Sequence, residues 1–364
     1  MPEVDNEKDI PRNMVVSMQE QQQRLQKINS KIQALEDKIR QANISISQVG
    51  EINKEAEVYS KVGRLFIKAQ KNQVVEDLDN QLTSSGKQLI CLRKNKILLR
   101  HQMKDIENSC RELMSREPVE SLSRAVVMFT HSHPHLSGKK VWVAFNSFTE
   151  PRLQDGPQCG IVALVVAAKL MGVEGMTVDM VMELVIKREF SKRGEMFSVD
   201  SMATIAEEIM PSCYVKVEQT TKLLDTMWLV DMLMKGGVMI VPYDCGPDNR
   251  PVLAKGHKAH WAIITGFLIP SSSIPDQSSP LPACPGFHLL SSAVPCQLEE
   301  DYVMLVARQS KSMELGIWGR DKLVESCMNL QEAAQKRLDG SYILPDGGLR
   351  SGLCGRMLVV KAPP

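Results

Sequence analysis

The sequence has no proline over a long amino-terminal stretch and almost no aromatic residues there. Proline is absent between residues 12 and 117, and Tyr59 and Phe66 are the two aromatic residues of the first 116 positions. All four tryptophans lie beyond that stretch. Proline disrupts helix interiors, and aromatic side chains are typical of packed cores. We therefore expect an α-helical, non-globular amino-terminal part followed by a packed domain.

The chain also lacks a strong net charge, a CxxC pair and a long apolar run. The formal net charge is +1 over 364 residues, which argues against nucleic-acid binding by bulk electrostatics. Nine scattered cysteines are typical of free thiols in a reducing compartment. No segment resembles a signal peptide or a membrane span. A cytoplasmic protein without nucleic-acid or membrane partners is expected.

One histidine-rich segment, His131-Ser132-His133-Pro134-His135, suggests metal binding at first sight. Nothing nearby completes a set of ligands, and short histidine-rich linkers are usually solvated. No metal and no cofactor is therefore expected.

Two heptad patterns occupy the amino-terminal part. Their positions step by alternating threes and fours, and few of them are polar: Met14, Met18, Gln21, Leu25, Ile28, Ile32, Leu35, Ile39, Ala42, Ile46 and Val49, then Leu78, Leu82, Ser85, Leu89, Leu92, Lys96, Leu99, Met103, Ile106, Cys110 and Leu113. Two such helices, each roughly 50 Å long, predict an antiparallel coiled coil. The β formers of Val58–Ile67 between them predict a short hairpin.

The stretch from Glu51 to Ile67 resembles the β-type subunit of prefoldin, specifically subunit 1. Its most specific part is the Tyr-x-x-Val-Gly-Arg-x-Phe core at residues 59–66. The resemblance covers roughly residues 10 to 116. It implies a hexameric chaperone that holds nascent actin and tubulin, with other prefoldin subunits as partners. A generic dimerising coiled coil is the alternative.

A candidate nucleophile, Cys159, stands in Asp155-Gly156-Pro157-Gln158-Cys159-Gly160, directly before an apolar run that predicts a buried helix over 160–171. At a helix N-terminus, free amides and the helix dipole stabilise a thiolate and can lower a cysteine pKa from about 8.5 to roughly 3.5–7.5. About a hundred residues on, His257 and His260 precede a hydrophobic strand. We favour His260 as the base, because the strand beginning at Trp261 fixes its position. Such a pair is typical of papain-like thiol hydrolases.

The remaining catalytic roles have two candidates each. Gln154 is the first candidate for the oxyanion donor, with Gln158 as the fallback. Asp321 is the first candidate for the residue that orients the histidine, and Asp244 is the second; either could instead be a helix cap or turn residue.

Cys354 competes with Cys159 as nucleophile, but it precedes a strand and so lacks a helix dipole. It is expected to be structural, in a tight glycine turn.

The coarse pattern of the second part predicts an α+β fold. Strands are expected at 141–145, 213–217, 238–242, 261–269, 302–308 and 356–361, and helices at 160–171, 177–189 and 199–210. We divide the chain into a coiled coil at 1–116, a linker at 117–140 and a cysteine protease domain at 141–364. The Ser/Pro-rich segment 270–300 is expected to be a disordered insertion.

Five motifs in order resemble the actin maturation proteases from about Trp142 to the end of the chain. They are residues 156–160 (Gly-Pro-Gln-Cys-Gly), 194–199 (Gly-Glu-Met-Phe-Ser-Val), 241–244 (Val-Pro-Tyr-Asp), 255–262 (Lys-Gly-His-Lys-Ala-His-Trp-Ala) and 352–355 (Gly-Leu-Cys-Gly). The resemblance implies a cysteine aminopeptidase-like protease that removes the N-acetylated Met or Cys from the amino terminus of actin. The alternatives are a non-enzymatic prefoldin-type chaperone subunit and two neighbouring genes joined in one reading frame.

Overall fold

The computed structural model describes residues 10–53, 56–62, 65–116, 118–133, 141–291, 298–299 and 302–363. The chain divides into two compact units, Met1–Cys110 and Arg111–Pro364.

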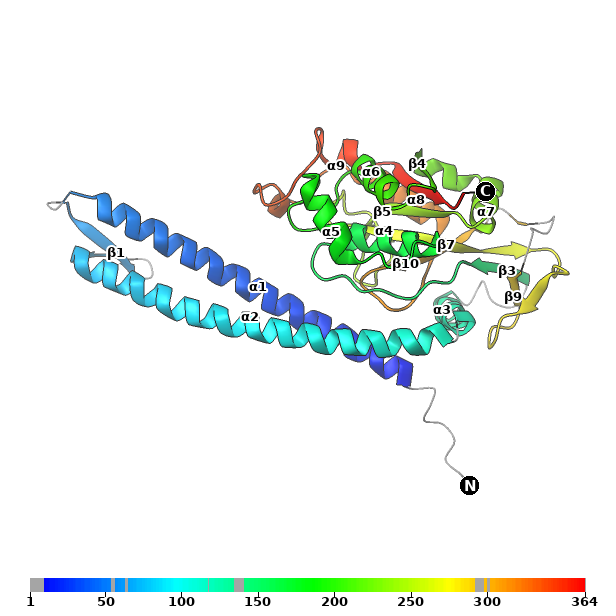
Figure 1. Cartoon of the computed structure of the whole chain (residues 1–364), viewed down its shortest axis with the longest axis horizontal. Coiled ribbons are helices and arrows are strands. Elements are labelled where there is room, and N and C mark those ends of the chain that lie inside the picture. Colours follow the sequence, from blue (N-terminus) through cyan, green and yellow to red (C-terminus); the bar gives the residue numbers. More distant parts are fainter. Residues whose placement is uncertain are drawn as a thin grey trace, which may run out of the picture. The chain divides into compact units, whose positions relative to one another are not determined.

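The first unit is a helical hairpin with a small sheet. Helix α1 (Ile10–Glu51) and helix α2 (Lys71–Arg116) lie side by side in Figure 1. Strands β1 (Val58–Val62) and β2 (Leu65–Ala69) pair antiparallel between them. Arg93 of α2 donates to Glu36 of α1 at 2.9 Å, which fixes the antiparallel alignment. The predicted coiled coil and hairpin are confirmed.

The seam between the two helices follows the heptads. Its most buried apolar side chains all come from predicted positions: Leu25, Ile32, Ala42 and Val49 of α1, and Leu99 and Met103 of α2. Because a heptad repeat keeps one stripe of each helix facing its partner, the local sequence was sufficient to predict this unit.

The second unit is built on one mixed sheet. In the described residues the main path runs β4 (Tyr214–Gln219), β12 (Arg356–Lys361), β5 (Val238–Cys245), β7 (Ala259–Ser271), β3 (Val141–Asn146), β9 (Phe287–Leu290) and β8 (Ser278–Pro280). Strand β10 (Met304–Gln309) pairs with β7 and with β11 (Gly316–Gly319), and β6 (Pro251–Val252) pairs with β5. The long strand β7 is buried along nearly its whole length and is the spine of the sheet.

Helices cover the sheet on both sides (Figure 1). They are α4 (Cys159–Leu170), α5 (Val178–Lys187), α6 (Val199–Ile209), α7 (Thr226–Met234), α8 (Arg320–Met328) and α9 (Gly348–Gly352), with short 3-10 turns η2 (Thr220–Leu224) and η3 (Gln335–Arg337). Helix α4 is apolar on all sides and packs against β7 in the larger core. A helix that is apolar all round is a buried one. The predicted α+β fold class is confirmed.

The segment expected to be a linker is largely a packed helix. Helix α3 (Pro118–Ser132) buries Leu122, Val126 and Phe129 in a second core with Trp142 and Phe287. These three side chains repeat at spacings of four and three, which is one face of a helix. The linker interpretation of 117–140 is therefore wrong over 118–132, and 134–140 lie outside the described residues.

The segment 270–300 is also more ordered than expected. Strand β7 continues to Ser271, and β8 and β9 form an antiparallel pair whose second strand runs parallel to β3. Phe287 of β9 stacks on Trp142, with ring centroids 5.7 Å apart. Pairing with a distant strand supplies the order that the local Ser/Pro composition does not predict. Residues 292–297 lie outside the described part of the chain.

Candidate active site

Cys159 is the first residue of α4. It follows a turn whose backbone conformation is one that glycine favours. Gly156 has φ +75°, a conformation that favours glycine. Gln158 is the N-cap of α4 and makes no side-chain cap bond. Cys159 is 9% exposed, so its thiol lies at the buried start of an apolar helix.

Gly160 lets α4 approach β7 closely. A Cβ at this position would lie 3.1 Å from both Met196 Cβ and Trp261 Cδ1, tighter than ordinary packing allows. The indole of Trp261 is itself fixed, because its Nε1 donates to the Met196 carbonyl at 2.8 Å. Cys159 and Trp261 line the same small cavity, and the backbone of Trp261 and of Gly160 acts to lower the pKa of the Cys159 thiol. The thiol therefore lies against β7 immediately beyond His260.

His260 lies next to Trp261 and is 3% exposed. The Gln309 side chain hydrogen-bonds its imidazole. Among the described residues, Nε2 of His260 is buried without a hydrogen-bond partner. Buried polar atoms are rarely left without a partner, and exceptions concentrate at functional sites. The imidazole thus has one ring nitrogen without a partner in the described part of the chain, and its neighbour in β7, Trp261, is the residue that lies next to Cys159.

Gln309 was not among the residues singled out from the sequence. It ends β10, in register with Ala262 of β7, and its Oε1 accepts from the Lys311 backbone N–H at 2.7 Å. Both residues that the sequence suggested for orienting the histidine, Asp321 and Asp244, are acids. One signal for Gln309 was present in the sequence, which was the strand predicted at 302–308. The pairing of that strand with β7 could not be predicted from the local sequence.

Asp321 does not lie beside the histidine. It occupies the first turn of α8, its side chain is 67% exposed, and it pairs with the adjacent Arg320 at 3.4 Å. An acid in the first turn of a helix is favoured by the helix dipole, which explains its place there. The first candidate for the orienting residue is thus directed to solvent, while His260 is buried.

Asp244, the second candidate, is fully buried and organises the loop before His260. Its carboxylate accepts from the backbone N–H groups of Ala254 (3.0 Å), Gly256 (2.7 Å) and Lys258 (2.8 Å). Its oxygens are therefore occupied by the 254–258 loop. Asp244 positions the histidine through the backbone rather than through the imidazole.

His257 sits on that same loop, half-exposed, with Nε2 3.5 Å from Glu332 Oε1. Cys354 lies elsewhere, where it donates to the Met328 carbonyl and accepts from Gln331 Nε2, each at 3.0 Å. Burial raises the pKa of Cys354. Neither residue makes a contact with the Cys159–His260 pair in the described part of the chain.

The two glutamines of the nucleophile turn are held differently. The Gln154 carboxamide is anchored at both ends: Oε1 accepts from Ser310 Oγ at 2.7 Å, and Nε2 donates to the Gly156 carbonyl at 2.5 Å. Gln158 packs against Gly194, where an added Cβ would lie 2.7 Å from Gln158 Cγ. Gln154 is the more firmly positioned of the two.

Burial determines the protonation of the pair. It raises the pKa of Cys159, although hydrogen bonds from Trp261 and Gly160 and the charges of Lys311 and Arg337 act in the opposite direction. This is opposite to the lowered pKa expected from the helix N-terminus, because removal from water disfavours the thiolate. Burial also holds the pKa of His260 well below 6.5. Burial therefore disfavours the charged form of both side chains.

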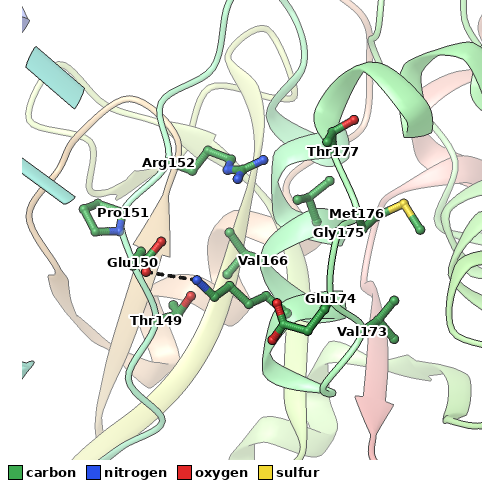
Figure 2. A pocket seen from close by; sticks show the side chains of 12 residues that line it. Thr149, Glu150, Pro151, Arg152, Val166, Val173, Glu174, Gly175, Met176 and Thr177 are labelled. Carbon is green, nitrogen blue, oxygen red and sulfur yellow. Dashed lines mark ion pairs between the residues drawn. The ribbon is translucent and has the colours of Figure 1, made fainter. Parts of the chain in front are cut away.

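Two hollows lie along α4, and the smaller one is lined by the nucleophile. A small cavity is lined by Cys159, Trp261 and Gln309, among others. A larger groove of about 220 Å³ lies alongside, and Arg152 and Val166 line both. Lys169 of α4 also lines this groove and forms an ion pair of 3.0 Å with Glu150, which is labelled in Figure 2. The groove is polar and leads away from the thiol.

In the described ranges, no helix is both long and apolar enough to cross a membrane. Likewise, no cluster of three or more His, Cys, Asp or Glu side chains suited to a metal ion occurs in the described part of the chain.

Comparison with known proteins gives two matches on separate parts of the chain. Residues 149–268 match the family "Actin maturation protease-like, C-terminal domain", and residues 12–117 match the prefoldin subunit family. Among curated relatives, the actin maturation protease of Xenopus tropicalis is 32% identical over 64% of this chain and 78% of its own length. The Homo sapiens protein of that name is 33% identical over 60% and 66%.

Solved structures match the amino-terminal part. The prefoldin β subunit of Thermococcus strain KS-1 matches 31% of this chain and 96% of its own, with 19% identity and a TM-score of 0.28.

Proposed function

The chain belongs to the actin maturation protease family, and we propose that it is a cysteine protease that cleaves near the amino terminus of actin. Actin is the substrate that the relatives' name gives. The resemblance of the five sequence motifs implies that the released residue is an N-acetylated Met or Cys. Cys159 is the nucleophile and His260 the base.

One observation supports this proposal: Cys159 and Trp261, the neighbour of His260 in β7, line the same small cavity. The Trp261 backbone favours the Cys159 thiolate, and Nε2 of His260 is buried without a partner among the described residues. A nucleophile within reach of a base, and a base held by a third group, is the arrangement of covalent catalysis. A degenerate, non-enzymatic domain has no need of it.

The chemistry starts from the neutral pair. His260 Nε2 takes the thiol proton as Sγ attacks the scissile carbonyl, and a tetrahedral oxyanion forms. The Cys159 backbone N–H and the Gln154 amide stabilise that oxyanion. His260 then protonates the departing amine, which leaves a thioester on Cys159. Water, deprotonated by His260, attacks the thioester, and the acid and free thiol are released.

Two further residues position the base. Gln309 hydrogen-bonds the imidazole of His260 and orients it, and Nε2, which has no partner among the described residues, takes the thiol proton. Asp244 holds the preceding loop through three backbone N–H groups.

The test is cleavage of an N-acetylated actin amino-terminal peptide by the full-length protein, followed by mass spectrometry. Cys159→Ala is expected to abolish product formation, and Cys354→Ala serves as the matched thiol control and is expected to retain it. Cleavage that persists in Cys159→Ala and is lost in Cys354→Ala would reverse the assignment.

A second role is favoured by the amino-terminal unit, which we propose joins other prefoldin subunits. In the described residues its sheet has two strands, with Tyr59 53% and Ile67 51% exposed. An isolated two-stranded hairpin is only marginally stable in water, so neighbouring strands would stabilise it. We propose the cytoplasm as its location, because the seven cysteines of the described residues are all free thiols.

A further inference from the structure

A cation lies over the active site with no carboxylate bound to it. Arg337 ends η3, and its guanidinium donates to the carbonyls of Gly256 (3.4 Å) and Ala259 (3.5 Å). Ala259 directly precedes the proposed base His260. The same guanidinium lies 5.1 Å from the ring centroid of Phe197. Both distances are long for N–H···O hydrogen bonds, so these two carbonyls bind the guanidinium only weakly.

The carboxylates near Arg337 are already occupied. Asp244 is bound by three backbone N–H groups of the 254–258 loop. Glu195 accepts from the backbone N–H groups of Lys192 (3.1 Å), Arg193 (2.9 Å) and Ile343 (3.5 Å). Among the described residues, no carboxylate oxygen lies within 4.0 Å of the Arg337 guanidinium. A half-buried cation without such a partner is electrostatically costly.

A second cation, Lys311, directly follows Gln309 and Ser310, which line the small cavity together with Cys159. Lys311 follows the end of β10, and its backbone N–H donates to Gln309, the residue that holds His260. Within the described ranges its ammonium group also lacks a carboxylate within 4.0 Å. Burial raises the pKa of Cys159, and both Lys311 and Arg337 oppose it, which shows that each charge is felt at the sulfur.

We propose that Arg337 and Lys311 together bind carboxylates of the substrate next to the scissile bond, and so select an acidic peptide. This inference rests on the proposed protease function and assigns the residues that determine its specificity. A guanidinium bound to the loop before His260 and an ammonium next to the lining of the Cys159 cavity suit a peptide with acidic residues in sequence. Charge-assisted hydrogen bonds to a desolvated carboxylate are stronger than neutral ones, and the peptide would supply the missing counter-charge.

An alternative role for the two cations is to favour the Cys159 thiolate without touching substrate. That role would affect every substrate equally, because the thiol attacks the same carbonyl in each. Recognition of a carboxylate affects only the acidic ones. The ratio of kcat/KM between matched peptides therefore separates the two roles.

The experiment uses the full-length protein and four N-acetyl-Met peptides in which the next two residues are Asp-Asp, Asp-Ala, Ala-Asp or Ala-Ala. Arg337→Gln and Lys311→Gln are compared with Lys235→Gln, which removes an exposed cation already paired with Asp231 at 2.7 Å. The ratio of Asp-Asp to Ala-Ala is expected to fall about 10- to 100-fold in each active-site variant. It is expected to stay unchanged in Lys235→Gln.

Two results overturn the proposal: an equal loss on all four peptides, or an unchanged ratio in both active-site variants. If Arg337→Gln does not fold, Lys311→Gln and Arg337→Lys, which keeps the charge, are used instead. The ratio of kcat/KM between the Asp-Asp and Ala-Ala peptides is measured in the same way. A wild-type protein that cleaves through Cys159 without preferring acidic peptides defeats this inference alone. Cleavage that survives Cys159→Ala defeats the proposed function.

Discussion

Gln309 hydrogen-bonds the imidazole of His260 from the neighbouring strand, at the point where β10 ends beside β7. The residue that we propose orients the base therefore comes from a strand that follows β7 in the chain and pairs with it. An amide takes the place where an acid was expected.

Gln309→Ala is expected to lower kcat by on the order of 10²-fold with little change in KM, because the imidazole loses its fixed orientation. The dependence of kcat/KM on pH measures the effect of the same substitution on the pKa of His260. Burial lowers the pKa of His260 and the Gln309 bond raises it, so loss of the bond moves that pKa further below 6.5. The acid limb of kcat/KM should therefore shift to lower pH. An unchanged limb would show that Gln309 does not act on His260.

Asp244→Asn is expected to destabilise the fold by about 2–4 kcal/mol, because an amide cannot accept all three backbone N–H bonds. Urea unfolding followed by circular dichroism measures the change. Asp321→Asn is the matched control, since that carboxylate is exposed and its loss should change stability by less than about 0.5 kcal/mol. Equal effects of the two substitutions would contradict the assigned roles.

Thiol alkylation should be slow at Cys159 in the free protein. Burial raises its pKa, so its rate should still be increasing above pH 9.0, the ordinary value. The exposed Cys91 is expected to react first, and peptide mass mapping over time distinguishes the two. Rapid modification of Cys159 at neutral pH would instead support the low-pKa thiolate that the helix N-terminus alone predicts.

Gln154→Ala is expected to reduce kcat by on the order of 10²–10³-fold, the usual cost of one oxyanion donor. Gln158→Ala should cost less, because that side chain is not anchored toward the nucleophile by any hydrogen bond at the cap. Single-turnover kinetics on the acetylated peptide gives both values. A larger loss in Gln158→Ala would exchange the two roles.

Ile67→Asp is expected to abolish co-purification with other prefoldin subunits while peptide cleavage continues. The side chain is half-exposed on the two-stranded sheet, where a charge would oppose strand addition. Ile90→Asp, at a comparably exposed position on α2, is the control and should still co-purify. Persistent assembly of the Ile67 variant would favour a simple coiled-coil appendage.

The sequence alone predicted what depends on local pattern. The heptads of α1 and α2 and the turn before Cys159 are local, and they were assigned correctly to elements. Gln309 could not be found in this way, because its contact with His260 depends on how β10 pairs with β7. The direction of the Cys159 pKa shift also depends on burial by distant residues, which no local motif records.

Helix α3 determines where the protease begins. Leu122, Val126 and Phe129 cover one face of the sheet, against Trp142 and Phe287. A fragment expressed from Val141 onward would leave that aromatic surface open to water, and such surfaces drive aggregation. A soluble, minimal enzyme therefore has to start before Pro118, almost at the last turn of α2. The division between the two parts of this chain therefore falls before α3 and not at Val141, where the first strand of the sheet begins.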